Sequence, residues 1–119
     1  MKFSIKNGSA AKELHDCVIL GVYESQELSA AAQQVDSVSE GFLTKILKRG
    51  DFDGKLETTL ILHDVANVAS ARVMLVGLGK ATAFTEKHYC KAVRASLKAL
   101  VKSGAKNAVT FLAELTVKN

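Results

Sequence analysis

Proline and tryptophan are absent from this 119-residue chain, and aromatic residues make up only 6% of it. Valine, leucine, isoleucine and alanine must therefore supply most of the core, as is typical of helices packed on a sheet. Because 48% of the residues are hydrophobic and 24% are charged, we expect the chain to fold and not to remain disordered. Its length predicts a single domain, residues 1–119, with one core.

Long apolar runs are missing as well. A helix that crosses a bilayer of about 30 Å needs about 20 apolar residues, and no run in this chain approaches that length. Residues 1–6 alternate apolar and polar side chains, so they lack the continuous apolar segment of a signal peptide. We therefore expect a cytoplasmic protein that makes no contact with membranes.

Cysteine is scarce, with two residues in the whole chain. Cys17 lies in an apolar run, and Cys90 lies in a helical pattern. The two are predicted to be reduced core residues and not a disulfide, which also fits a cytosolic location.

Positive charge is concentrated in the second half of the chain. Residues 1–59 carry 7 Lys or Arg against 9 Asp or Glu, a balance of −2, whereas residues 60–119 carry 9 against 3, a balance of +6. A basic half indicates either an anionic partner or a solvated face.

Five segments have the patterns of strands. They are residues 3–5, 17–23, 58–63, 71–79 and 108–112. The first alternates like an edge strand, whereas residues 17–23 and 71–79 are apolar at consecutive positions, which indicates burial on both faces. Residues 7–9 predict a turn, residues 51–55 a turn or short hairpin, and residues 64–70 a connection.

Two helices are predicted. Ser37 followed by Glu40 forms a capping box for the first helix, which ends before Gly50. Thr85 caps the second helix, which runs to about Ser103. The order β-β-α-β-β-α-β predicts an α/β fold with a mixed sheet flanked by helices.

The second predicted helix has two distinct faces. Its apolar face is predicted to comprise Tyr89, Val93, Leu97, Leu100 and Val101. Its basic face comprises Lys87, Lys91, Arg94, Lys98 and Lys102, and these five side chains fall within an arc of roughly 80° at about 100° per residue. The basic face is either a solvated surface that maintains solubility or a stripe that contacts phosphates. No aromatic side chains interleave with it, so the duplex backbone is the better candidate among nucleic acids.

Catalytic residues and metal ligands are not indicated anywhere. His15, His63 and His88 lie on separate predicted elements without metal-ligand spacing, and the cysteines form no CxxC pair. No GxSxG nucleophile motif occurs. We therefore predict that the chain itself holds no cofactor.

One loop is a weak candidate for ligand binding. Gly77, Gly79 and Lys80 follow a buried strand and precede a helix, where open α/β sheets bind ligands. The spacing matches neither the dinucleotide motif GxGxxG nor the phosphate loop GxxxxGK[ST]. A tight turn that leaves the sheet is the alternative interpretation.

Several segments together resemble the N-terminal domain of the bacterial cytosol (leucyl) aminopeptidase family. They are residues 1–6 (MKFSIK), 17–23 (CVILGVY), 39–42 (SEGF), 47–55 (LKRGDFDGK), 59–63 (TLILH), 72–80 (RVMLVGLGK) and 111–115 (FLAEL). Their order and spacing carry the resemblance, which covers essentially the whole chain.

The resemblance implies a macro-domain-like three-layer sandwich without catalytic function. Family members are hexameric peptidases that use two divalent metals, Zn or Mn, to remove N-terminal residues such as leucine from peptides. Their metal ligands and a bicarbonate-assisting arginine lie in a C-terminal catalytic domain, which is absent from this chain. The N-terminal domain contributes to assembly, and some bacterial members also bind DNA.

Three functions follow as expectations: an assembly domain, a duplex-DNA-binding module, or a nucleotide or ADP-ribose binder of macro-domain type. The family's domain usually continues with a further helix and strand beyond residue 119, so the sandwich is expected to be truncated. Uncovered apolar sheet surface then favours a homo-oligomer.

Overall fold

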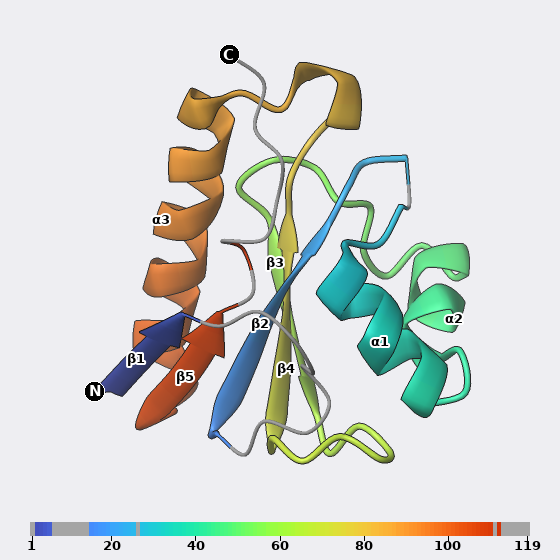
Figure 1. The fold of residues 1–119 in the computed structure, drawn as a ribbon, viewed down its shortest axis with the longest axis vertical. Helices are drawn as coiled ribbons and strands as arrows, with labels where there is room; N and C mark the ends of the chain where they lie inside the picture. The colour runs from blue at the N-terminus through green and yellow to red at the C-terminus, as the bar shows by residue number, and fades with distance from the viewer. Residues whose placement is uncertain (1, 6–14, 26, 111, 113–119) are drawn as a thin grey trace.

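Five strands form one mixed sheet at the centre of the molecule (Figure 1). The computed structural model describes residues 2–5, 15–25, 27–110 and 112. Its strands are β1 (Lys2–Ile5), β2 (Cys17–Val22), β3 (Thr59–His63), β4 (Arg72–Gly77) and β5 (Asn107–Thr110). The spatial order is β1-β5-β2-β4-β3; β1, β5, β2 and β4 are parallel, and β3 runs antiparallel to β4 at the sheet edge.

The two most apolar segments occupy the middle of this sheet. All six residues of β2 are buried, as are all residues of β4 after Arg72. Because side chains alternate across a strand, consecutive apolar residues place apolar side chains on both faces of the sheet. The sequence-based prediction of two doubly covered strands is confirmed, as is the edge position of the first strand.

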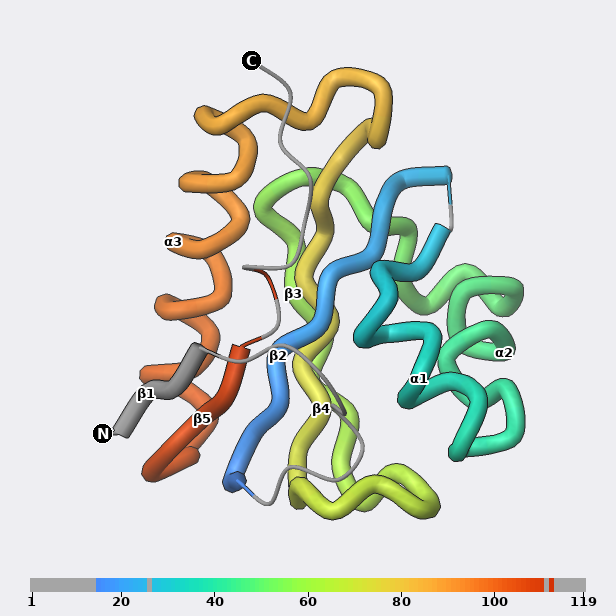
Figure 2. Tube along the Cα trace, in the orientation of Figure 1, coloured from blue at the N-terminus to red at the C-terminus, as the bar shows by residue number. Residues whose placement is uncertain are grey.

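Helices cover both faces of the sheet, as Figures 1 and 2 show. The helices are α1 (Ala30–Val38), α2 (Phe42–Lys48) and α3 (Glu86–Ser103), with a short 3-10 helix, η2 (Ala81–Ala83), before α3. Val18 and Leu20 of β2 pack in one cluster with residues of α1 and α2, whereas Ile19 packs in a second cluster with Ala92 and Leu100 of α3. The mixed sheet flanked by helices is therefore confirmed.

The first predicted helix corresponds to α2, but its predicted start is too early, and α1 is not predicted by the sequence pattern. Ser37 lies inside α1, and Glu40 has a left-handed backbone with φ of 60° between α1 and α2. Residue 40 therefore cannot act as the third helical residue that a capping box requires. The cap of α1 is Ser29, whose Oγ accepts a hydrogen bond from the Ala32 amide at 3.3 Å.

Asp36 of α1 caps the N-terminus of α2 in place of the predicted box. Its carboxylate accepts two hydrogen bonds from Thr44, one from the amide at 3.0 Å and one from Oγ1 at 2.6 Å. The residue before α2 is Gly41, which has φ of 81° and provides no side-chain cap. A carboxylate from the preceding helix therefore satisfies an amide in the first turn of α2 and fixes the angle between the two helices.

The second predicted helix is correct in extent. Thr85 Oγ1 accepts a hydrogen bond from the His88 amide at 3.4 Å, and Gly104 ends α3 with φ of 81°. The predicted apolar face is wrong in part, because Leu97 and Val101 are 41% and 75% exposed. A different face of α3 is buried, and it includes two small residues. Its buried positions are Ala92, Ser96 and Leu100.

Smaller differences concern Cys90 and the strand ends. Both cysteines are free, but Cys90 is exposed, so its assignment to the core is wrong. Of the predicted last strand, residues 108–110 lie in β5 and Leu112 does not, whereas Phe111 lies outside the described residues. The turn near residues 51–55 is confirmed by a hydrogen bond from the Lys55 amide to Asp53 Oδ1. The predicted turn at residues 7–9 lies outside the described residues.

Among the described residues, no helix combines the length and apolar character needed to span a membrane.

Candidate functional site

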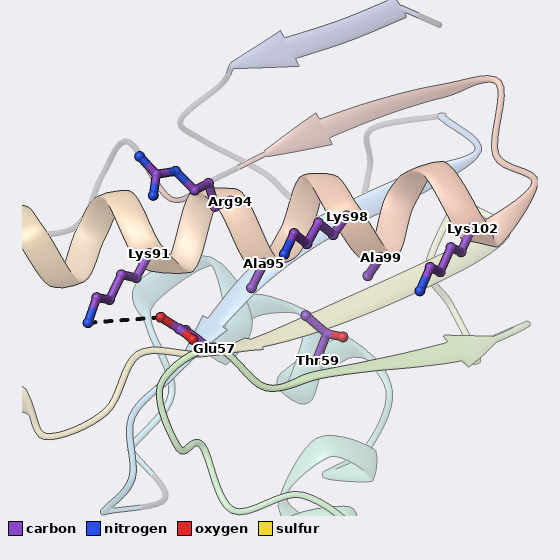
Figure 3. A pocket seen from close by; sticks show the side chains of 8 residues that line it. All are labelled: Glu57, Thr59, Lys91, Arg94, Ala95, Lys98, Ala99 and Lys102. Atoms are coloured by element: carbon purple, nitrogen blue, oxygen red, sulfur yellow. Dashed lines mark ion pairs between the residues drawn. The ribbon is translucent and has the colours of Figure 1, made fainter.

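A groove of about 470 Å³ lies between α3 and the beginning of β3 (Figure 3). One wall is the side of α3 that carries the basic residues, and the other is formed at the edge of the sheet. The lining residues are Glu57, Thr59, Lys91, Arg94, Ala95, Lys98, Ala99 and Lys102.

The groove gathers four of the five basic residues predicted as a stripe: Lys91, Arg94, Lys98 and Lys102. Their spacing of three or four residues places them along one side of the helix. Ala95 and Ala99 lie between them, and their small side chains leave room for the groove. Lys87 is exposed in the first turn of α3 and does not line it.

Negative charge in the groove comes from Glu57 alone among its lining residues. Its Oε1 lies 4.0 Å from Lys91 Nζ, and the two side chains are 57% and 39% exposed. An exposed pair at this distance contributes about 0 to 1 kcal/mol. No described acidic group forms a salt bridge with Arg94, Lys98 or Lys102. The groove therefore holds a positive potential that its own residues do not neutralise.

Sequence reasoning found the basic wall of this groove and missed the other. Glu57 and Thr59 join the site only because β3 is an edge strand beneath α3. The sequence of residues 58–63 predicts a strand but contains no information about its place in the sheet.

The candidate ligand loop at Gly77, Gly79 and Lys80 is packed against the protein's own backbone. The Gly77 amide donates to the Thr58 carbonyl at 2.8 Å, and the Gly79 amide donates to the Gly54 carbonyl at 2.9 Å. A Cβ added at Gly77 would collide with the backbone carbonyl of Lys55. The amides of Gly77 and Gly79 are thus occupied within the chain, and Lys80 remains exposed.

Titratable groups elsewhere in the described part of the chain do not converge on a second site. Within the described residues, no group of three His, Cys, Asp or Glu side chains could hold a metal ion. His15 precedes β2, His63 ends β3, and His88 lies in the first turn of α3. Burial raises the pKa of the Cys17 thiol from 9.0 to about 11, with a smaller opposing effect of the Arg72 charge. A thiol with a raised pKa is a weak nucleophile.

Comparison with known proteins gives three findings. The family model described as "Cytosol aminopeptidase family, N-terminal domain" matches residues 19–119. A probable cytosol aminopeptidase of Chromobacterium violaceum is 52% identical over 118 residues, which are 99% of this chain and 23% of that protein. The chain thus spans about a quarter of the length of the curated relatives it matches.

Solved structures share the fold. A tomato leucine aminopeptidase mutant superimposes with a TM-score of 0.68 at 24% identity, over 94% of this chain and 23% of that one. The macrodomain of Mycobacterium tuberculosis DarG superimposes with a TM-score of 0.69 at 10% identity, over 91% of this chain and 74% of that one. At these identities the likeness shows the fold alone, and it confirms the predicted macro-domain-like architecture.

Proposed function

Because this chain belongs to the cytosol aminopeptidase family, as its N-terminal domain, we propose that it is the non-catalytic part of a cytoplasmic leucyl aminopeptidase. The proposed whole protein removes N-terminal residues from peptides. The match of residues 19–119 to this domain of the family, in relatives about four times longer, is the observation that carries the proposal. The two divalent metals, Zn or Mn, then belong to the catalytic domain, which is the main partner of this chain.

Hydrolysis of leucine p-nitroanilide tests whether this chain alone has aminopeptidase activity. We expect no turnover by the purified 119-residue chain with Zn²⁺ or Mn²⁺ added. Metal-dependent turnover that co-elutes with the chain through size exclusion would overturn the proposal. A full-length relative assayed in parallel controls for the substrate and the metals.

The role of the domain within the proposed enzyme is assembly, as in the hexamer implied by the family. Support comes from α3, where Leu97 and Val101 lie one turn apart and are 41% and 75% exposed. Exposed apolar neighbours of this kind favour a protein contact. We expect light scattering to detect self-association that the double variant Leu97→Glu, Val101→Glu abolishes. A monomeric mass for the unmodified chain at high concentration would refute self-assembly through this domain.

Binding of duplex DNA is a second candidate function. The observation that favours it is the cluster of Lys91, Arg94 and Lys98 on one side of α3, of which only Lys91 pairs with a described acidic group. Counterion release from the duplex would make such binding fall steeply with salt.

The test of DNA binding compares two triple charge reversals. Glutamate at residues 91, 94 and 98 should abolish duplex binding in a gel-shift titration. Glutamate at Lys45, Lys48 and Arg49, on and just after α2, is the matched control and should have a smaller effect. Equal losses in both variants, or binding that is indifferent to salt, would eliminate the candidate.

A nucleotide or ADP-ribose site at Gly77, Gly79 and Lys80 stays a prediction from the sequence. The likeness to macrodomains concerns the fold alone, and two of the loop amides are already bonded within the chain. Calorimetric titration with ADP-ribose should release no binding heat, and saturable heat would restore this candidate.

A further inference from the structure

Strand β3 has one bonded edge and one edge with no partner among the described residues. Its register pairs Leu60 with Leu75 and Leu62 with Val73 of β4. The flanking bonds run from the Gly77 amide to the Thr58 carbonyl and from the Asp64 amide to the Ala71 carbonyl.

In an antiparallel pair, hydrogen-bonded and non-hydrogen-bonded residues alternate. Since residues 58 and 64 are bonded to β4, the even-numbered positions of β3 direct their amide and carbonyl groups toward β4. The amide and carbonyl groups of Thr59, Ile61 and His63 therefore point away from the sheet. Such an edge is a template for an additional strand.

The basic groove opens beside this edge. Thr59 lines the groove, and Ile61 packs against the core cluster on the α3 side. Figure 3 shows α3 lying along β3, with Lys91 near Glu57 at the start of the strand. The stretch from Lys91 to Lys102 covers about 16 Å at about 1.5 Å per residue. From Thr59 to His63, β3 covers about 14 Å at about 3.4 Å per residue, so the basic residues extend along the whole strand.

We propose that this groove binds an extended acidic peptide segment of a partner protein, which adds to the outer edge of β3 as a sixth strand. The peptide backbone bonds to Thr59, Ile61 and His63, and acidic side chains at alternate positions face Arg94, Lys98 and Lys102. Alternate residues of a strand lie about 7 Å apart. One helical turn separates Lys98 from Lys102 by about 6 Å, so the two spacings match.

The backbone edge favours a peptide over nucleic acid at this groove. A phosphate backbone offers acceptors only, so it would leave the three outward carbonyls of β3 without donors, whereas a peptide strand supplies both amides and carbonyls. A second copy of this chain is disfavoured, since pairing two β3 edges would bring two sets of α3 cations together.

The test uses a fluorescein-labelled peptide of about seven residues in which glutamate alternates with threonine. We expect fluorescence anisotropy to show saturable binding to the 119-residue chain. The same peptide with its backbone amides N-methylated at alternate positions, and a peptide of equal composition with consecutive glutamates, should bind at least tenfold more weakly. Amide hydrogen exchange at Thr59, Ile61 and His63 should slow when the alternating peptide is bound.

Matched charge reversals test the cations. Lys98→Glu with Lys102→Glu removes two attractions and adds two repulsions, so it should weaken binding about tenfold or more. Lys45→Glu with Lys48→Glu makes the same charge change in the last turn of α2 and should leave affinity within about twofold. Circular dichroism confirms that both variants are folded.

Three outcomes would overturn the proposal. One is the absence of saturable binding by the alternating peptide. Another is binding that tolerates N-methylation, which means attraction to charge without strand addition. The third is displacement of the peptide by duplex DNA with no peptide-induced protection of the β3 amides, which assigns the groove to polyanions.

Discussion

Replacing Asp36 by alanine should destabilise the chain far more than replacing its neighbour Ser37. The Asp36 carboxylate accepts two hydrogen bonds from Thr44. A hydrogen bond to a charged group contributes about 1.5 to 3 kcal/mol, and loss of a helix cap costs about 0.5 to 2 kcal/mol. Because Asp36 is only half-buried and both bonds reach one residue, we expect a loss of about 2 kcal/mol for Asp36→Ala.

Ser37→Ala is the matched control because Ser37 lies exposed in the last turn of α1. Alanine has the higher helix propensity, so the change should stay within about 0.5 kcal/mol. Urea denaturation followed by circular dichroism measures both values.

The two variants distinguish the Asp36 cap that the structure shows from the Ser37 capping box that the sequence alone indicates. If Ser37→Ala costs about 1 kcal/mol or more and Asp36→Ala costs less, then Ser37 is the cap and the assigned start of α2 is wrong. Asp36→Asn retains an acceptor for the Thr44 amide and should fall between the two.

Two further predictions concern burial. Leu100→Ala should cost about 2 to 5 kcal/mol in urea denaturation, whereas Leu97→Ser or Val101→Ser should cost about 0.5 kcal/mol or less. Equal costs would contradict the burial of Leu100 and the exposure of the other two. Burial raises the pKa of Cys17 from 9.0 to about 11, so the native state retains its thiol proton where the unfolded state loses it. The resulting stability is complete below about pH 9 and is lost as the pH rises to about 11, by about 2 to 3 kcal/mol. Cys17→Ala should remove this part of the pH dependence. A thiol reagent should modify only Cys90 in the folded chain, and rapid modification of Cys17 would refute its burial.

The strands could be predicted from the sequence because their signal is local. Consecutive apolar residues in β2 and β4 can be buried only by cover on both faces, and the structure provides it. The ends of α3 are likewise determined by local features. The Thr85 side chain caps its first turn, and the left-handed backbone of Gly104 ends it.

The remaining features depend on contacts between distant residues. Helix α1 begins with three alanines, which favour a helix without marking a face, so the pattern does not reveal α1, and Ser37 inside it resembles a cap for the helix that follows. Leu97 is exposed because the sheet accepts the small residues Ala92 and Ser96 instead. The groove combines α3 with an edge strand whose position follows from pairing with β4, and no local pattern reports that pairing.

The strand order also determines when the sheet can be completed during synthesis. Strands β2, β4 and β3 lie side by side and are all translated by Gly77, whereas β5 lies between β1 and β2. Lys2 therefore pairs with Asn107, and β1 must wait for β5, which is synthesised about 100 residues later, before it finds a neighbour among the described strands. A nascent chain arrested before β5 should present β2 with one vacant edge, a natural binding site for a chaperone.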